Sequence, residues 1–355
     1  MAQGADNERK GMNKLKGLAI GIGSLPYTEE APALDLIFKY LPETPFWPQL
    51  PKRDIREGMV AQFSQNLPCL KMTSDGIFYD PKNQEHELEI FYEQIISNNL
   101  DYFKIGPDFA SGLFEFYTRL EKANLEKVEF IKCQITGPIT FAASIKDNKG
   151  VALLHDPVFL QVITKGLIMK ALWQIKLFSK FGKKIIVFLD EPYLSGFGSA
   201  FTPIDKASVV KELSEVADGI KTENTLVGVH CCGNTDWSIF TDIKSIDIIN
   251  FDAFSFMDKF TLYAKDLAGF LKRNGIICWG VVPTQEFTGE ETAGSLVDRV
   301  KQGIGDLVKK GVNKGLAADN LLVSPSCGLG ALDPLKAEKI LKLLFEASAI
   351  LRNSP

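Results

Sequence analysis

The order of strand-like and helix-like segments limits this chain to a small set of folds. Short runs of β-branched and other apolar residues alternate with longer segments whose apolar residues recur three and four positions apart. We predict strands at residues 18–22, 129–135, 184–189, 225–230, 246–251, 275–281 and 321–323. We predict amphipathic helices at residues 205–220, 259–274, 291–310 and 334–351. This alternation is typical of a parallel sheet joined by crossover helices, so the predicted fold class is α/β.

The length of the chain favours a TIM (β/α)8 barrel. Such a barrel takes about 250 residues and often carries insertions, and the 355 residues show no linker-like shift in composition. We therefore expect a single barrel domain at residues 17–355, after a flexible polar lead-in at residues 1–16. The eighth strand is not evident, because residues 42–105 combine a proline-rich stretch with one helical segment at residues 85–98. This region is predicted to hold an insertion.

Composition and charge exclude two classes of partner. Forty Lys and Arg against 44 Asp and Glu give a net charge of −4, and no basic cluster stands out, so we expect no nucleic acid. Residues 158–177 are apolar but are interrupted by Gln161, Lys165, Lys170 and Lys176, so we expect no membrane span. The first residues lack the apolar core of a signal peptide, which predicts a cytoplasmic protein.

Three residues have the spacing of metal ligands. His230 and Cys232 stand two apart at the end of a predicted strand, so their side chains point to one side. Cys327 follows the last predicted strand, and a closed barrel would bring it to the same C-terminal mouth. Two cysteines and one histidine with an open fourth position are a ligand set of catalytic zinc. The alternative, ordinary buried thiols, is preferred for the other cysteines: Cys69, Cys133, Cys231 and Cys278.

Six short motifs carry a resemblance to a known family. In chain order they are Ile22-Gly-Ser24-Leu-Pro26, Ile135-Thr-Gly-Pro-Ile-Thr140, Leu189-Asp190-Glu191-Pro192, His230-Cys-Cys232, Asp247-Ile-Ile-Asn-Phe-Asp252 and Pro325-Ser-Cys327-Gly-Leu329. Together they resemble the catalytic barrel of cobalamin-independent methionine synthase. That barrel belongs to a superfamily that also contains uroporphyrinogen decarboxylase and the methylcobamide:coenzyme M methyltransferases.

The resemblance implies a particular metal site. His230, Cys232 and Cys327 would bind zinc, with Asp252 as an acidic fourth ligand at the position where the methionine synthases carry Glu. A zinc-bound thiol is deprotonated and attacks as its thiolate, so the site would activate a small thiol substrate.

The resemblance also implies an acceptor site for an amino-acid thiol. Ser24, in the same motif as Ile22, would bind the carboxylate, and Asp190 would bind the ammonium group; we assign all three to substrate binding. Asp190 and Glu191 also resemble a general acid/base pair. Adjacent strand residues face opposite sides, so only one can enter the barrel; we choose Asp190 as catalytic and regard Glu191 as structural.

Two departures from the methionine synthases bear on function. Ala61 stands where those enzymes have a Glu that also holds the substrate ammonium, and Gln285 lies in the segment where they present a catalytic His. The chain also shows no second, N-terminal half of the kind that helps full-length methionine synthases bind methylfolate. We therefore expect a methylated corrinoid such as methylcobalamin, free or on a carrier protein, as methyl donor, with methyltetrahydrofolate as the other possibility.

These observations predict a zinc-dependent methyltransferase whose acceptor is a small thiol, with homocysteine, giving methionine, as the first choice. Three alternatives stay open. They are a uroporphyrinogen decarboxylase-like enzyme, a methylcorrinoid:coenzyme M-type methyltransferase, and a non-catalytic zinc- or corrinoid-binding relative.

Overall fold

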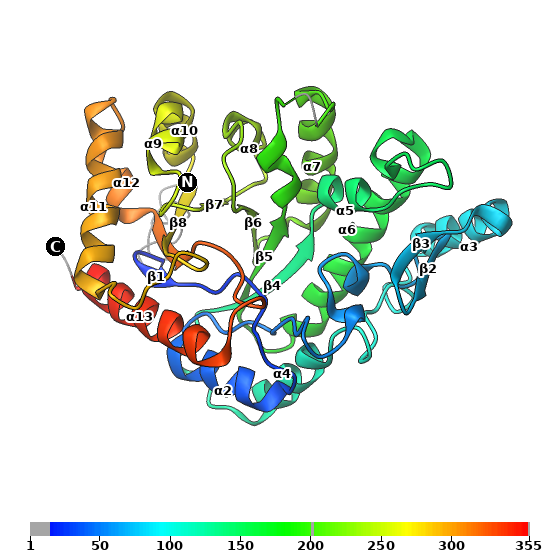
Figure 1. Ribbon diagram of the computed structural model, residues 1–355, viewed down its shortest axis with the longest axis horizontal. Coiled ribbons are helices and arrows are strands. Elements are labelled where there is room, and N and C mark those ends of the chain that lie inside the picture. The colour runs from blue at the N-terminus through cyan, green and yellow to red at the C-terminus, as the bar shows by residue number, and fades with distance from the viewer. Residues whose placement is uncertain (1–14, 200–201, 354–355) are drawn as a thin grey trace.

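A curled sheet of seven parallel strands forms the centre of the computed structural model, which describes residues 15–199 and 202–353 (Figure 1). Its order is β1-β9-β8-β7-β6-β5-β4. The strands are β1 (Leu18–Ala19), β4 (Phe130–Thr136), β5 (Lys184–Asp190), β6 (Thr225–Cys231), β7 (Ile248–Phe251), β8 (Ile276–Val282) and β9 (Leu321–Pro325). Each overlaps a predicted strand, and every pairing between them is parallel. The α/β prediction is therefore confirmed.

Residues 44–50 lie between the two edges of this sheet, β1 and β4. Ser24 pairs with Gln49, and Phe46 pairs with Lys132, each through an isolated parallel bridge rather than a continuous ladder. Two residues of the segment are prolines, which have no backbone N–H to donate, so it cannot pair as a strand along its whole length. The described residues thus form a curled sheet of seven strands, a half-barrel with an irregular segment between its edges, and the complete eight-stranded barrel stays a prediction.

Helices cover the outer face of the curled sheet (Figure 1). They are α2 (Glu30–Tyr40), α4 (Ser111–Lys122), α5 (Pro138–Ser144), α6 (Pro157–Ser179), α7 (Lys206–Ile220), α8 (Ser238–Asp242), α9 (Met257–Phe260), α10 (Ala264–Lys272), α11 (Ala293–Lys309), α12 (Lys314–Asp319) and α13 (Pro334–Arg352). Asp156, Asp205 and Asp333 accept hydrogen bonds from backbone N–H groups in the first turns of α6, α7 and α13. These N-caps fix where the three helices begin.

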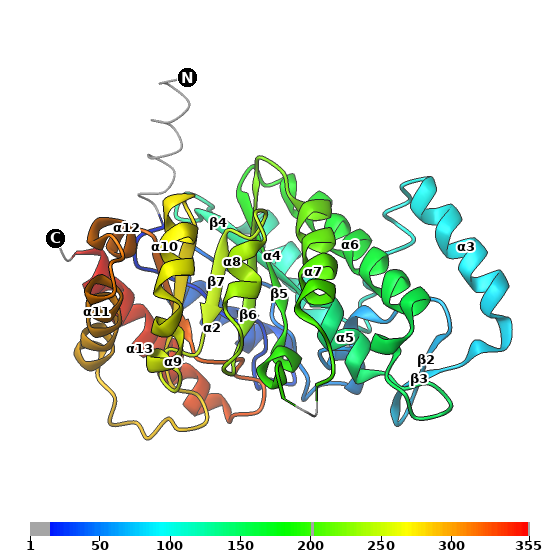
Figure 2. The same ribbon diagram turned by 90° about the horizontal axis from the view of Figure 1, so that it is seen from above.

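Part of the predicted insertion, residues 70–96, forms a small unit outside the sheet. Strands β2 (Leu70–Thr73) and β3 (Gly76–Tyr79) make an antiparallel hairpin, followed by the predicted helix, α3 (Gln84–Ile96). Figure 2 shows this unit projecting at one end of the molecule. Only Phe91 of α3 is buried, so this helix has few contacts with the rest of the fold.

Helix α6 is the one described helix that is long and apolar enough to cross a membrane by length and composition. Its most apolar stretch is 67% buried inside the fold, however, as in the core helix of a globular domain. Lys170, at its centre, is fully buried and donates a hydrogen bond to the carbonyl oxygen of Gln65 at 2.6 Å. Lys170, one of the charged residues noted in the sequence of this helix, therefore links α6 to the insertion.

The apolar core has two parts. The larger part lies between the sheet and the helices, and a smaller one lines the inside of the curled sheet. The inner cluster comprises Leu15, Leu18, Ile20, Phe130, Ile186, Phe188, Ile248, Ile276, Cys278 and Leu322. Leu15 of the predicted lead-in is thus buried, whereas residues 1–14 lie outside the described residues.

Polar side chains take the place of this inner cluster toward the carboxyl ends of the strands. They include Asp190, His230, Asn250 and Ser324, all buried. Because all seven strands are parallel, their carboxyl ends meet at the same rim, where the sites of such folds are built. The fold therefore gathers these four side chains at one end of the half-barrel.

We expect Gly228→Ala, on β6, to destabilise the protein. A Cβ at this position would lie 2.3 Å from the ring of Phe188, which is fully buried and cannot move away without disturbing its neighbours. Overpacking of this kind costs about 1–3 kcal/mol, which urea denaturation would detect. Gly305→Ala in α11 is the control, because its Cβ would meet no atom within 4 Å and alanine favours the helix. Equal denaturation midpoints for the two variants would contradict this packing.

Candidate metal centre

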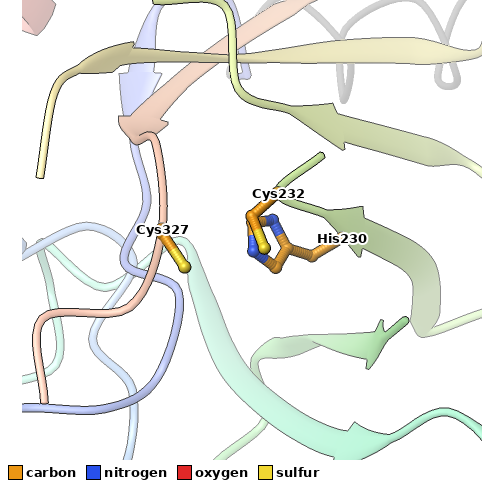
Figure 3. A group of neighbouring side chains, drawn as sticks. All are labelled: His230, Cys232 and Cys327. Atoms are coloured by element: carbon orange, nitrogen blue, oxygen red, sulfur yellow. The ribbon is translucent and has the colours of Figure 1, made fainter. Parts of the chain in front are cut away.

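The structure brings together the three residues whose spacing suggested metal ligands. His230 lies near the end of β6, Cys232 directly follows that strand, and Cys327 lies just after β9. Their ligand atoms all lie within 4.8 Å of one another. Figure 3 shows the Cys327 side chain pointing from its own loop toward His230 and Cys232. Residues almost a hundred positions apart in the sequence thus form one compact group of donors.

Asn250, on β7, fixes the orientation of the His230 ring. Its amide nitrogen donates to the carbonyl oxygen of Cys278 at 3.0 Å and to Oγ of Ser324 at 2.8 Å. Its amide oxygen is therefore left to face Nδ1 of His230, which must donate the proton. In the neutral ring this leaves Nε2 with a free lone pair, the form in which histidine binds a metal.

The two cysteines of the group differ in acidity. Hydrogen bonding from the Cys327 thiol, helped by His230, holds the pKa of Cys232 well below its usual range despite burial. The same hydrogen bond and burial raise the pKa of Cys327. Burial lowers the pKa of His230, but the hydrogen bond that its ring can donate to the Cys232 sulfur and the negative charges of Asp190 and Cys232 outweigh burial and raise that pKa. The group therefore already favours one thiolate.

Cys231, between the two β6 ligands, behaves as the predicted ordinary thiol. It is fully buried in the cluster between sheet and helices, and burial raises its pKa to about 12. Its Sγ contacts the carbonyl oxygen of Gly233 at 3.6 Å. Cys69, Cys133 and Cys278 are buried as well, as expected.

Asp190 ends β5 beside His230, with which it is in register across the sheet. It is buried, and its Oδ1 atom has no hydrogen-bond partner among the described residues. Burial raises the pKa of Asp190 to about 6, although the positive charges of Lys132 and His230 oppose the shift. An unpaired buried carboxylate oxygen is costly, which distinguishes Asp190 from the paired polar groups around it.

Glu191 faces the other way, as the alternation of strand side chains required. Its carboxylate accepts hydrogen bonds from the backbone N–H groups of Ile139 and Thr140 at 3.0 and 2.8 Å and from the Thr140 hydroxyl at 2.6 Å. It thereby satisfies the N-terminus of α5. These contacts fit the structural role that we expected for Glu191.

Ser24 and Ile22 lie on the segment that follows β1. Oγ of Ser24 accepts a hydrogen bond from the N–H of Gly330 at 3.1 Å, in the loop that carries Cys327. The carbonyl oxygen of Ile22 accepts a hydrogen bond from the ammonium group of Lys132. Both expected substrate-binding residues are therefore tied to neighbours of the candidate site.

Asp252 is not part of the three-residue group of donors. It follows β7 at the same rim, but its Oδ1 accepts hydrogen bonds from the N–H groups of Phe254 and Ser255, both at 2.9 Å. Burial raises its pKa. The short side chain is engaged in closing the turn after β7, so a role as fourth ligand stays a prediction.

Two residues of this region are not predicted from the sequence to belong to the site. Asn250 and Lys132 each interrupt an apolar strand at an inward-facing position, and both are fully buried. A polar residue buried in a strand needs a partner, and this was the available signal. What it could not reveal was which partner each residue would meet.

Comparison with known proteins found one curated relative and a solved structure with partial similarity. No family model matches the sequence. The methionine synthase of Methanocaldococcus jannaschii is 27% identical over 231 residues, which cover 62% of this chain and 65% of that protein. The solved structure of a B12-independent methionine synthase from Shewanella sp. W3-18-1, in complex with selenomethionine, is 20% identical with a TM-score of 0.46, over 67% of this chain and 66% of that chain. The match in sequence confirms the resemblance to the methionine synthases.

In metal-free protein, we expect iodoacetamide to alkylate Cys232 at pH 6 faster than any other cysteine, because its pKa is held low. Cys327→Ala removes the hydrogen-bond donor, so the pKa of Cys232 should rise. Alkylation at pH 6 should then slow by about tenfold or more, and the difference should shrink by pH 9. Peptide mass spectrometry would follow the reaction, with Cys133→Ala as a control. An unchanged rate in Cys327→Ala at pH 6 would contradict the pairing.

Proposed function

Because the chain is related to the methionine synthases, we propose that it is a zinc-dependent methyltransferase acting on the thiol of homocysteine and forming methionine. The observation that carries the proposal is the compact group of His230, Cys232 and Cys327, with the ring of His230 oriented by Asn250. In this proposal the fold is a TIM-type barrel in which residues 44–50 take the position of the eighth strand.

The chemistry of the three donors fits zinc. Thiolate sulfur and imidazole nitrogen are its preferred protein ligands, and catalytic sites use three of them with a fourth position left for water or substrate. The lowered pKa of Cys232 and the free Nε2 of His230 both favour the metal-binding forms. When bound, zinc would convert the acceptor thiol to the nucleophilic thiolate near neutral pH. The Asp252 carboxylate lies outside the group of three donors, and its role as a fourth ligand stays a prediction.

Asp190 and Ser24 would hold the two ends of the amino-acid head group. The unpartnered Oδ1 of Asp190 can accept a hydrogen bond from the acceptor's ammonium group, a charge-assisted contact that removes the cost of leaving this oxygen unpaired. The half-buried Ser24 hydroxyl, which accepts from Gly330, still has its own proton to donate to a carboxylate. Two such contacts fix the direction of the thiol, and orientation alone can account for several kcal/mol of a reaction barrier.

A thiol sulfonate such as coenzyme M is the second candidate acceptor. Ala61 provides no carboxylate at the position where the methionine synthases have Glu, and it is buried beside a neutral residue, Gln62. An acceptor without an ammonium group would therefore lose less here than in those enzymes. The methyl donor, a methylated corrinoid with or without a carrier protein, or methyltetrahydrofolate, is the part of the proposal that depends on experiment.

The metal assignment predicts that purified protein holds about one zinc per chain and that His230→Ala and Cys327→Ser each lose it. Elemental analysis after gel filtration measures the content, and circular dichroism checks the fold. Cys231→Ala is the matched control, because this neighbouring thiol faces the helices and should leave the zinc in place. If Cys327→Ser retained a full complement of zinc, that ligand would be wrongly assigned.

Zinc-loaded protein should form methionine from homocysteine when methylcobalamin or methyltetrahydrofolate is the methyl donor. Liquid chromatography measures the methionine formed. Asp190→Asn should lower kcat/KM for homocysteine by about tenfold or more, because it removes a charge-assisted hydrogen bond. With coenzyme M, which has no ammonium group, the same substitution should have little effect. Absence of methyl transfer to either thiol from both donors would refute the proposed activity.

A further inference from the structure

Lys132, on β4, places a positive charge inside the half-barrel. Its side chain is fully buried, and its ammonium group donates hydrogen bonds to the carbonyl oxygen of Ile22 and to Oε1 of Gln134, the latter at 3.0 Å. The ammonium also lies 5.6 and 5.0 Å from the ring centroids of Phe46 and Phe188. Burial lowers its pKa to about 8, so the fold bears a cost in keeping a lysine here.

The hydrogen bond to Ile22 is made where β1 loses its regular pairing. The strand itself ends at Ala19, and Ile20 makes the next backbone hydrogen bond to β9, through the carbonyl oxygen of Val323. Farther along, Gly23 accepts from the N–H of Gln49 at 3.0 Å. Lys132 therefore supplies a donor from across the interior to a carbonyl group between these two points.

The held segment leads directly to the candidate site. Ser24, two residues after Ile22, accepts hydrogen bonds through both of its oxygens from the loop that follows β9. Its carbonyl oxygen accepts from the N–H of Leu329 at 3.0 Å, and its hydroxyl accepts from Gly330 at 3.1 Å. A shift of Ile22 would therefore move the hydroxyl that the proposed function assigns to the acceptor's carboxylate.

Charge adds to this geometry. The positive charge of Lys132 opposes the rise that burial causes in the pKa of Asp190, on the neighbouring strand β5.

We infer that Lys132 is a positioning residue for the carboxylate end of the acceptor, and that it acts by holding the Ile22–Ser24 segment. This inference rests on the proposed function, since it takes an amino-acid thiol as the acceptor. Lys132 touches neither the acceptor nor the group of metal-binding donors in this scheme. Its effect should therefore appear in binding of the head group.

Lys170 is a matched control within the same chain. It is also fully buried, and it donates only to the carbonyl oxygens of Gln65 and Phe103, at 2.6 and 3.5 Å, between α6 and the insertion. Lys170→Met and Lys132→Met each remove a buried ammonium group and keep a side chain of similar length. Loss of stability alone should affect both variants.

Calorimetric titration of the zinc-loaded protein tests the inference with three ligands. They are the product L-methionine, its analogue 3-(methylthio)propylamine, which lacks the carboxylate, and 4-(methylthio)butanoate, which lacks the ammonium group. In Lys132→Met we expect the Kd for L-methionine and for the butanoate to rise by about tenfold or more, as for loss of a hydrogen bond to a charged group. The Kd for the amine should stay within about threefold of the parent value, and Lys170→Met should match the parent for all three ligands.

The outcomes separate this inference from the proposed function. If the parent protein binds L-methionine and Lys132→Met binds it equally well, Lys132 has no positioning role. Equal losses in Lys132→Met and Lys170→Met, or equal losses for all three ligands, also overturn it. If the parent itself neither binds L-methionine nor methylates homocysteine, the proposed function fails and this inference with it. If Lys132→Met does not fold, Lys132→Gln replaces it. Glutamine keeps a polar side chain but has no positive charge, and its amide nitrogen is one bond too short to reach Ile22 in the same way.

Discussion

Polar groups inside the curled sheet are shielded from water and must satisfy one another, and the candidate site depends on this constraint. Asn250 shows it most clearly. Its amide nitrogen has two acceptors, Cys278 and Ser324, and leaving either unpaired in the interior would cost about 1–3 kcal/mol. The amide can therefore face only one way, which fixes the proton of His230 on Nδ1 and leaves Nε2 toward the two cysteines. A requirement of folding thus sets the chemical form of a candidate metal ligand.

Asp190 is the exception to this rule, and its position explains why it matters. Its Oδ1 is one of four buried side-chain atoms without a partner among the described residues, and it is the only carboxylate oxygen of the four. Leaving this oxygen unpaired at the rim beside His230 lowers the stability of the fold. Glu191, its neighbour in sequence, is fully satisfied at the start of α5. Of these two adjacent acidic residues, Glu191 therefore stabilises the fold, whereas Asp190 keeps one buried oxygen without a partner among the described residues.

Most of the fold could be predicted from the sequence because it depends on local patterns. All seven strands and the helices α7, α11 and α13 follow from periodicity. Residues 44–50 could not be recognised, because two prolines prevent a strand pattern while tertiary contacts with Ser24 and Lys132 still place the segment between the sheet edges. The predicted helix at residues 259–274 is interrupted by a 3₁₀ turn at Thr261–Tyr263. The apolar period continues across that turn, so periodicity alone does not predict the interruption.

The site was predictable to the same extent. His230 and Cys232 follow from strand alternation, and Cys327 from the meeting of parallel strand ends, so the group of donors needed no long-range information. Asp252 required more, because whether a short carboxylate reaches a metal or closes its own turn depends on backbone geometry after β7. Asn250 and Lys132 were visible only as polar residues in apolar strands, and their partners come from three other strands and the segment after β1.

The replacement at Ala61 changes how such a site must hold its acceptor. Two carboxylates near one ammonium group would strengthen its binding but would repel each other when the site is empty, which raises the pKa of one of them. Here the neighbouring Gln62 is neutral and is bound to Gln49 and to the carbonyl oxygen of Phe109, each at 2.7 Å, so it supplies rigidity instead of charge. Under the proposed function, Asp190 would be the carboxylate for the ammonium group, with Lys132 nearby as a counter-charge. Selectivity for an amino acid would then depend on how accurately Ser24 and its segment are held, and buried hydrogen bonds rather than a second acidic residue hold that segment.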